Sequence, residues 1–363
     1  MARLTTLALL ALGADARLNS GAAGNTTEKA AAGSTNGAGA LEGTFVLHKR
    51  YALDGPPTEE FDVVEIPDAS LTQSCSNYID DNSTVFSRDG KLVLKVASHC
   101  EGGGCLNSGR VMSKDSFKYG LFTFSAKVPK CNYIWPAIWL LPNNTHGEGT
   151  YGRWPCSGEI DVLETVHDGA CGAFNLVAGY GSAGGCGAEM MCNKCVPGYC
   201  TSTTMGQSHN HADLYYIEDA DCNAEHPTWE EHRFVLNWQP DELTTWVDPY
   251  LTWDEEGHLV GVTPKASPPT AGFPTWRTYK RQTTPTWQAV GDFMQTCFEE
   301  KPAPDAPFDD RFKIVLNIAV GGYGGAPCRW GSNECQTTCG KAVGSEMIMA
   351  DISVWELADK GKA

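Results

Sequence analysis

The chain has little positive charge and few long hydrophobic runs. Its 363 residues carry 27 Lys and Arg against 44 Asp and Glu, a formal net charge of -17 at pH 7. Phosphate backbones and anionic lipids repel so acidic a surface, so we expect neither a nucleic acid nor a membrane as a partner. No long stretch has helical periodicity, and no internal repeat is present. These absences favour a protein that acts on a neutral ligand.

Short runs that alternate apolar and polar residues are abundant instead. Gly, Pro, Asn and Asp separate them, as at Arg88-Asp89-Gly90. With 42% apolar residues the chain has enough material for a sizeable core. This pattern predicts an all-β fold in which two sheets enclose that core. The expected strands cover residues 91–97, 121–128, 134–141, 233–238, 313–318 and 348–355.

The first 42 residues differ in composition from the rest. Residues 1–16 contain Arg3, a short apolar run and the small-residue sequence Ala14-Asp15-Ala16, which together predict a cleaved secretory signal. Residues 17–42 are rich in Gly, Ala, Ser, Thr and Asn and predict a disordered linker. We expect one folded domain at 43–358 and a polar tail at 359–363.

Fifteen cysteines are too many for an ordinary cytosolic enzyme and predict disulfides formed in an oxidising compartment. Their number is odd, so at least one thiol is free or pairs between chains. Cys192 and Cys195 also have the spacing of a zinc knuckle, although the secretory signal favours disulfides. Asn-x-Ser/Thr sequences at Asn25, Asn82 and Asn143 are candidate glycosylation sites in a secreted protein.

Three carboxylates lie in a segment that otherwise reads as a buried strand. Glu159 and Asp161 share one face because side chains alternate along a strand. Glu164 returns to that face only if a β-bulge adds a residue at 162 or 163. Like charges side by side repel, so the presence of three carboxylates here needs an explanation. Either the segment is an exposed strand edge or the acids have a function. A retaining glycosidase needs an ionised carboxylate that attacks the sugar and a protonated one that donates to the leaving oxygen.

The residues around these acids resemble glycoside hydrolase family 16, in its laminarinase-like (endo-β-1,3-glucanase) branch. Residues 154–165 (WPCSGEIDVLET) are similar to the active-site strand of that family. Further motifs follow in the family's order: SGR at 108–110, WPAIWLLP at 135–142, HRFVLNWQPDE at 232–242, VLNIAVGG at 315–322 and the last strand at 349–355. The resemblance implies a β-jelly roll of two antiparallel sheets with a concave substrate cleft.

The resemblance also implies roles for the acids. Glu159 would be the nucleophile and Glu164 the general acid/base, while Asp161 would assist by holding Glu159 or by raising the pKa of a neighbouring carboxyl. The reaction would pass through a covalent glycosyl-enzyme and retain the anomeric configuration. It would need no cofactor and no metal in the cleft. Family members often carry a structural calcium elsewhere, with Asp351 at the position of one ligand.

Four further residues are candidates for substrate binding. By resemblance, Trp154 would stack on a sugar near the cleavage point. Trp135 and Trp139 share a face by alternation and serve either the cleft or the core. Arg110 would hydrogen-bond sugar hydroxyls or pair with a structural acid.

The expected function is that of a secreted, monomeric enzyme that hydrolyses β-1,3 or mixed-linkage glucan such as laminarin. A transglycosylase that uses the same acids and a non-catalytic β-glucan-binding recognition protein are the alternatives. Residues 172–176 lack the histidine often found there in laminarinases, which leaves the linkage open. The cysteine-rich segment at about 168–225 is longer than the family needs, and we expect an inserted loop beside the cleft.

Overall fold

The computed structural model describes most of the expected domain. The described residues are 40–68, 74–99, 106–129, 134–142, 149–150, 157, 159–164, 173–176, 179–180, 211–216, 231–240, 242–265, 276–280, 308–321, 337 and 339–358. The expected signal, nearly all of the expected linker, most of the cysteine-rich segment and the tail lie outside them. In the described part, no helix has the length and apolar character needed to cross a membrane.

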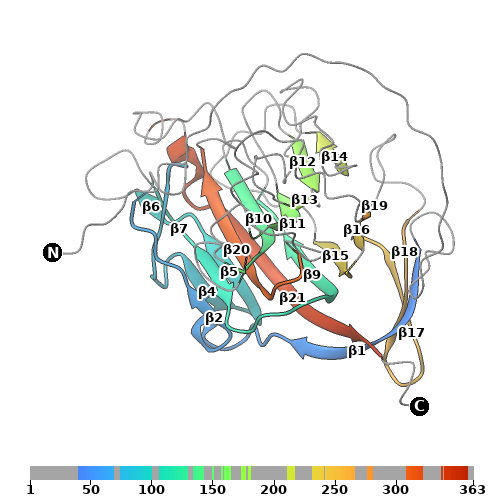
Figure 1. Cartoon of the computed structure of the whole chain (residues 1–363). Coiled ribbons are helices and arrows are strands. Elements are labelled where there is room, and N and C mark those ends of the chain that lie inside the picture. Colours follow the sequence, from blue (N-terminus) through green and yellow to red (C-terminus); the bar gives the residue numbers. More distant parts are fainter. Residues whose placement is uncertain are drawn as a thin grey trace.

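Two large antiparallel sheets form the body of the protein (Figure 1). The ten-stranded sheet follows the order β17 (Tyr250–Trp253), β18 (Leu259–Thr263), β1 (Leu41–Arg50), β21 (Glu346–Leu357), β9 (Gly120–Lys127), β15 (His232–Trp238), β16 (Glu242–Val247) and β19 (Trp276–Lys280), with β5 (Lys91–Lys95) and β4 (Val85–Arg88) attached through β21. The six-stranded sheet follows the order β13 (Gly179–Tyr180), β11 (Ile160–Glu164), β10 (Ile134–Pro142), β20 (Phe312–Val320), β8 (Arg110–Ser113) and β2 (Phe61–Val63).

Smaller elements flank the two sheets. β12 (Ala173–Leu176) pairs with β14 (His211–Tyr216), and a three-stranded sheet contains β3 (Ser76–Tyr78), β7 (Leu106–Ser108) and β6 (Ser98–His99). β3 and β7 are parallel, unlike the strands of the two large sheets. Two short 3-10 helices, η1 (Pro57–Glu59) and η5 (Cys339–Ala342), are also present.

The predicted all-β jelly roll is confirmed, and every expected strand forms within one or two residues of its expected bounds. β1 begins at Leu41, two residues before the expected start of the domain. It does so because Leu41 pairs with Val262 and is buried in an apolar cluster. The alternation of apolar residues is a local signal of a strand with one buried face, which explains why it located the strands so well.

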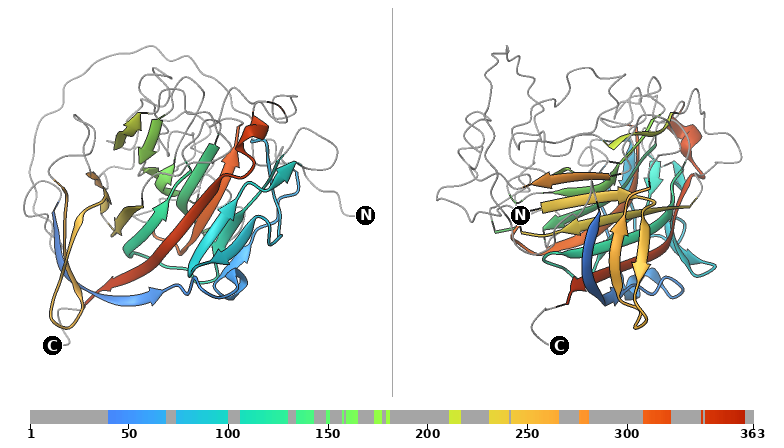
Figure 2. Two further views of the ribbon diagram at one scale, coloured as in Figure 1. Left: turned by 180° about the vertical axis from the view of Figure 1, so that it is seen from behind. Right: turned by 90° about the vertical axis from the view of Figure 1, so that its right-hand side faces the viewer.

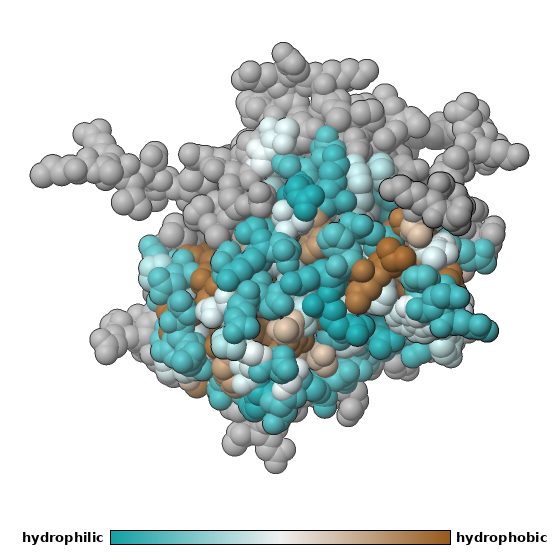
Figure 3. All heavy atoms as spheres, turned by 90° about the horizontal axis from the view of Figure 1, so that it is seen from below, coloured by the Kyte–Doolittle hydropathy of each residue, from teal (hydrophilic) through white to brown (hydrophobic). Residues whose placement is uncertain are grey.

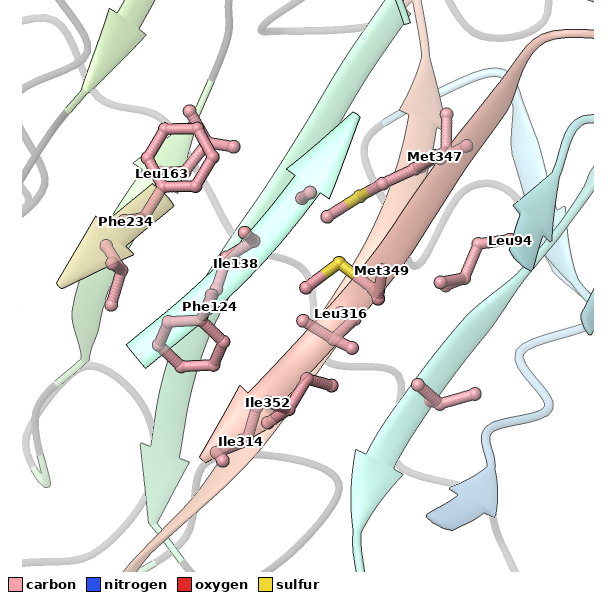
Figure 4. Packing of buried hydrophobic residues seen from close by; sticks show 14 of the residues in the cluster. Leu94, Phe124, Ile138, Leu163, Phe234, Ile314, Leu316, Met347, Met349 and Ile352 are labelled. Carbon is pink, nitrogen blue, oxygen red and sulfur yellow. The ribbon is translucent and has the colours of Figure 1, made fainter. Parts of the chain in front are cut away.

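The core lies between the two large sheets (Figure 4). Ile138, Leu163 and Leu316 enter it from the six-stranded sheet, and Phe124 and Phe234 meet them from the ten-stranded sheet. Each of these side chains is fully buried. Burial of one such side chain contributes roughly 1.5–3 kcal/mol to the free energy of unfolding, so this layer holds the six-stranded sheet in place.

One edge of the ten-stranded sheet rolls back across its own outer face (Figure 2). The register of β1 shifts between Glu42 and Phe45 against β18, and between Leu47 and Lys49 against β21. Such irregularities bend a strand and increase its twist. The bend closes a second apolar cluster, made of Leu41, Phe45, Leu121, Val235, Trp246, Leu259, Val262 and Trp355.

A carboxylate at the end of β16 makes stability depend on pH. Asp248 accepts hydrogen bonds from the Arg233 backbone N–H at 2.8 Å and lies 2.6 Å from Nδ1 of His232. Burial raises the pKa of the Asp248 carboxyl. Together, these hydrogen bonds and the charge of His232 lower the pKa by more than burial raises it, so the pKa lies below its usual value. A group with a lowered pKa in the folded state stabilises the protein above its unfolded pKa. That stability is lost as the pH falls through the folded pKa.

We therefore expect Asp248→Asn to lower the free energy of unfolding at neutral pH by about 1–2 kcal/mol. The loss of stability on acidification below about pH 4 should be shallower in the variant than in the wild type. Urea unfolding at a series of pH values measures both effects. Parallel stability curves for the two proteins would contradict the assignment.

Candidate active site

The acidic strand β11 contains the predicted bulge. In its pairing with β10, Ile160 lies opposite Leu140, Asp161 opposite Trp139 and Leu163 opposite Ile138, so Val162 is the extra residue. Ile160, Val162 and Leu163 are all fully buried in the core. The bulge therefore turns two successive apolar residues inward and gives Glu164 the register position opposite Ala137.

The neighbouring strands extend this outer face of the six-stranded sheet. Ala137 of β10 lies opposite Asn317 of β20, which lies opposite Arg110 of β8. One row of positions thus runs from Glu164 through Ala137 and Asn317 to Arg110. A second row runs from Asp161 through Trp139 and Val315 to Met112. Directly opposed residues share a face, so the acids of β11 and Arg110 belong to the same face.

Four side chains on this face form a connected set. The Trp139 indole N–H donates a hydrogen bond of 2.7 Å to Oδ1 of Asn317. The Arg110 guanidinium carbon lies 5.0 Å from the centroid of the Trp139 ring and 5.6 Å from that of Tyr78 on β3. A cation within about 6 Å of a ring centroid is attracted by the ring. Arg110 is therefore held between two aromatic rings, one of which Asn317 orients.

The charges on this face are screened from water. Arg110 is 9% exposed and Asp161 3% exposed, while Glu159 is half-buried. Burial lowers the pKa of Arg110, and the Tyr78 phenol when ionised and the Glu159 carboxylate oppose that change. Burial raises the pKa of Tyr78 to about 12, so its hydroxyl is neutral at ordinary pH. Arg110 keeps its proton because a guanidinium is too basic to lose it in a protein.

The structure brings most of the predicted site residues to one face. Asp161, Arg110 and Trp139 lie on it, and Trp135 follows by alternation along β10 and is half-buried. Glu164 is placed by its backbone register alone, and Trp154 lies outside the described residues.

Tyr78 and Asn317 were not selected from the sequence. Asn317 gives a weak signal, as a polar residue inside the apolar run of β20. Tyr78 gives none, because its strand is three residues long and joins the site only through the fold.

The described surroundings of Asp351 do not fit a calcium ion. Calcium takes roughly six to eight oxygen ligands, whereas Oδ1 of Asp351 lies 3.3 Å from the Arg50 guanidinium, and the Ser353 hydroxyl donates to the same carboxylate. Among the described residues, Asp254, Glu256 and His258 form a group whose ligand atoms lie within 4.8 Å of one another. Both Asp254 oxygens accept hydrogen bonds within the turn, from the backbone N–H and the ring of His258, which explains the group without an ion.

Comparison with known proteins places this site in a family. The XgeA-like catalytic GH16 domain matches residues 69–225. A glucan endo-1,3-beta-glucosidase of Cryptopygus antarcticus is 38% identical over 257 residues, covering 66% of this chain and 67% of that protein. A beta-1,3-glucan-binding protein of Penaeus monodon is 30% identical over 216 residues, covering 60% of this chain and 46% of that protein. The chain thus spans about half the length of the Penaeus relative.

A solved structure supports the fold. The laminarinase from Rhodothermus marinus aligns with a TM-score of 0.54 over 87% of this chain and 98% of that chain, at 20% sequence identity. At this identity the likeness concerns the fold alone. It agrees with the jelly roll of two antiparallel sheets.

Proposed function

The chain belongs to glycoside hydrolase family 16, and we propose that it is a retaining endo-β-glucanase that hydrolyses β-1,3 or mixed β-1,3/1,4 glucans. The observation that carries this proposal is the bulged strand β11. Its register gives Asp161 and Glu164 positions on one face with Arg110 and Trp139, and it leaves Glu159 half-buried at the start of the strand. Carboxylates placed side by side repel one another and destabilise the fold, so a purely structural role does not explain them.

In the proposed reaction, Glu159 attacks the anomeric carbon and forms a covalent glycosyl-enzyme. Glu164 donates its proton to the leaving oxygen and then, as a base, takes a proton from the attacking water. Two inversions retain the anomeric configuration, which requires the two carboxyl groups to approach to about 5–5.5 Å. Asp161 lies between them in the sequence and would disfavour a second negative charge beside it, which helps to keep a proton on Glu164. The carboxylates supply all of this chemistry without a cofactor.

Trp139 supports binding of a neutral sugar. Its ring is half-exposed on the acidic face and is oriented by Asn317, so it offers a fixed apolar surface for a pyranose ring. Trp135 and Trp154 would extend this surface, and free N–H groups of Arg110 would donate to sugar hydroxyls. The formal charge of -17 disfavours sulfated polymers, which need a basic cleft.

A secreted and monomeric protein is part of the proposal. The expected signal sequence supports secretion, as do Cys75 and Cys339, the two described cysteines, which are both disulfide-bonded. The face seen in Figure 3 is mostly hydrophilic, with apolar side chains in small patches only. The described part of this face supports a monomer, because permanent interfaces need larger apolar areas than it shows.

The Penaeus relative named as a binding protein makes a non-catalytic β-glucan-binding protein the second candidate. Product analysis decides between them. Secreted protein is incubated with laminarin, mixed-linkage β-glucan and agarose, and the products are separated by size. Short β-1,3 oligosaccharides would support hydrolysis, and oligomers longer than a short starting substrate would indicate transglycosylation. Laminarin that is bound but never cut would overturn the enzyme assignment.

A further inference from the structure

We propose that a surface patch made of Leu47, Trp253 and Leu357 (the Trp253 patch) is a second β-glucan-binding site, on the side of the protein opposite the acidic strand β11. It holds a distant segment of the polymer, and it rests on the proposed function for the identity of that polymer. Four features of the molecule support it: the exposure of these side chains, the face they share, the support of the Trp253 ring, and the charge of the chain.

Exposure first sets these residues apart. Large apolar side chains of the described residues are mostly buried, and those that are exposed are Leu47 (45%), Tyr250 (61%), Trp253 (45%) and Leu357 (38%). Single exposed apolar side chains are common on protein surfaces, whereas a group of them marks a binding site more often. What matters is therefore whether these side chains gather in one place.

Strand pairing places three of them on one face. Leu47 of β1 lies directly opposite Trp355 of β21. Two residues away on each strand, Phe45 lies opposite Leu357. Directly opposed residues share a face, and so do residues two apart in a strand. Trp253 reaches this face through the pairing of β17 with β18 and of β18 with β1, and its ring centroid lies 5.1 Å from that of Trp355.

This face is the outer face of the ten-stranded sheet. Trp355 belongs to the apolar cluster that the rolled edge closes (Figure 2), whereas its neighbour Val354 belongs to the main core between the two sheets. The acids of β11 lie on the outer face of the other sheet, whose Leu163 enters that same main core. The two sheets alone are about 10 Å apart. The Trp253 patch is therefore separate from the cleft and is not one of its subsites.

The Trp253 ring is supported by a fixed neighbour. Trp355 is buried, and its indole N–H donates a hydrogen bond of 3.3 Å to Oγ1 of Thr123. The planes of the two indole rings are inclined by 58°, and aromatic pairs favour such offset or tilted contacts. A side chain that is already fixed loses little conformational entropy when it binds. Trp253 thus offers a flat apolar surface for the C–H face of a glucose unit, with an N–H group at its edge.

Charge and composition favour a neutral polysaccharide over other occupants. A second copy of the chain would bring a further formal charge of -17, and the copies would repel. The exposed parts of three side chains are also far smaller than the roughly 800 Å² that each partner buries in a stable interface. Residues 17–39 contain one large apolar side chain, Leu18, and residues 358–363 contain none, so these segments have little to cover the patch with. An uncharged glucan meets neither obstacle.

A second site on the opposite side affects long polymers only. When one segment of a glucan is bound at the Trp253 patch, another segment meets the cleft at a high effective concentration. The combined affinity then exceeds that of either site alone. A short oligosaccharide cannot span the two sides, so its hydrolysis does not depend on the patch.

The test compares a long and a short β-1,3-glucan. Binding to insoluble β-1,3-glucan is measured by depletion in the Glu159→Gln background, and hydrolysis of a β-1,3-linked tetrasaccharide is measured without that substitution. Trp253→Ala and Leu47→Ser disturb the patch, so that one patch variant remains if the other fails to fold. Trp253→Phe keeps an aromatic ring. Tyr250→Ala is the matched control, because it removes a more exposed aromatic side chain that alternation places on the opposite face of the same strand.

We expect Trp253→Ala to bind the insoluble glucan at least about tenfold more weakly, because one of two linked sites is lost. Leu47→Ser should lose less affinity, Trp253→Phe should keep most of it, and Tyr250→Ala should bind like its background. The values of kcat and KM for the tetrasaccharide should stay the same in all four.

Unchanged polymer binding in the folded patch variants, or an equal loss in Tyr250→Ala, would overturn the proposal. So would a wild type that sediments as a dimer and becomes monomeric in Trp253→Ala, because a second copy would then occupy the patch. The binding assay needs no activity, so a wild type that binds glucan at the patch but cuts none would refute the proposed function alone.

Discussion

Replacing Glu159 by glutamine is expected to lower glucan hydrolysis by at least about 10⁴-fold, because removal of a covalent nucleophile leaves only binding and electrostatic stabilisation. Glutamine has nearly the same shape as glutamate, and position 159 is half-buried at a strand end, so the fold should persist. Laminarin binding should persist as well, because Trp139 and Arg110 are untouched. Initial rates on laminarin, binding by calorimetry and thermal unfolding measure the three properties.

Two further variants make this test specific to the retaining mechanism. Glu159→Ala leaves a space in which azide can replace the carboxylate, so added azide should restore turnover and give a glycosyl azide of inverted configuration. Asp161→Asn keeps both proposed catalytic glutamates and should lose less activity than Glu159→Gln. Hydrolysis by Glu159→Gln within a few-fold of the wild type would show that the nucleophile lies elsewhere.

Loss of the disulfides at Cys75 and Cys339 is expected to lower the free energy of unfolding by about 2–5 kcal/mol each. Both residues are disulfide-bonded and fully buried in the main core. The Cys75 backbone also connects β20 with β7. Its backbone N–H donates to the Val320 carbonyl at 2.7 Å, and its carbonyl accepts from the Leu106 N–H at 2.7 Å. Cross-links of this kind restrict the unfolded chain and fix the end of β20.

Thermal unfolding with and without reductant measures the combined effect, and Cys75→Ala and Cys339→Ala measure the single bonds. A chelator is the control, since the described surroundings of Asp351, which pairs with Arg50, do not fit a calcium ion. It should leave the melting temperature unchanged. A lower melting temperature in the presence of the chelator would support the structural calcium expected from the sequence. A melting temperature indifferent to reductant would contradict the structural role of the disulfides.

Much of the fold could be predicted from the sequence because the relevant signals are local. Alternation with period two located the strands, and the spacing of Glu159, Asp161 and Glu164 required a bulge that the register of β11 confirms at Val162. Both inferences use residues that are close in the chain. The rolled edge formed by β17, β18 and β1 was not predicted. It depends on which strands pair across more than 200 residues, and alternation says nothing about partners.

The sequence by itself determined the fold class, the strands and the acids of the proposed active site. Only the tertiary structure decided which side chains surround those acids. Tyr78, Arg110, Trp139 and Asn317 come from four strands that lie far apart in the chain, and their contacts exist because β10, β20 and β8 are adjacent in one sheet. The physical reason is that strand pairing and core packing act between distant segments. Charge and stacking interactions fall off with distance in space, whatever the separation in sequence.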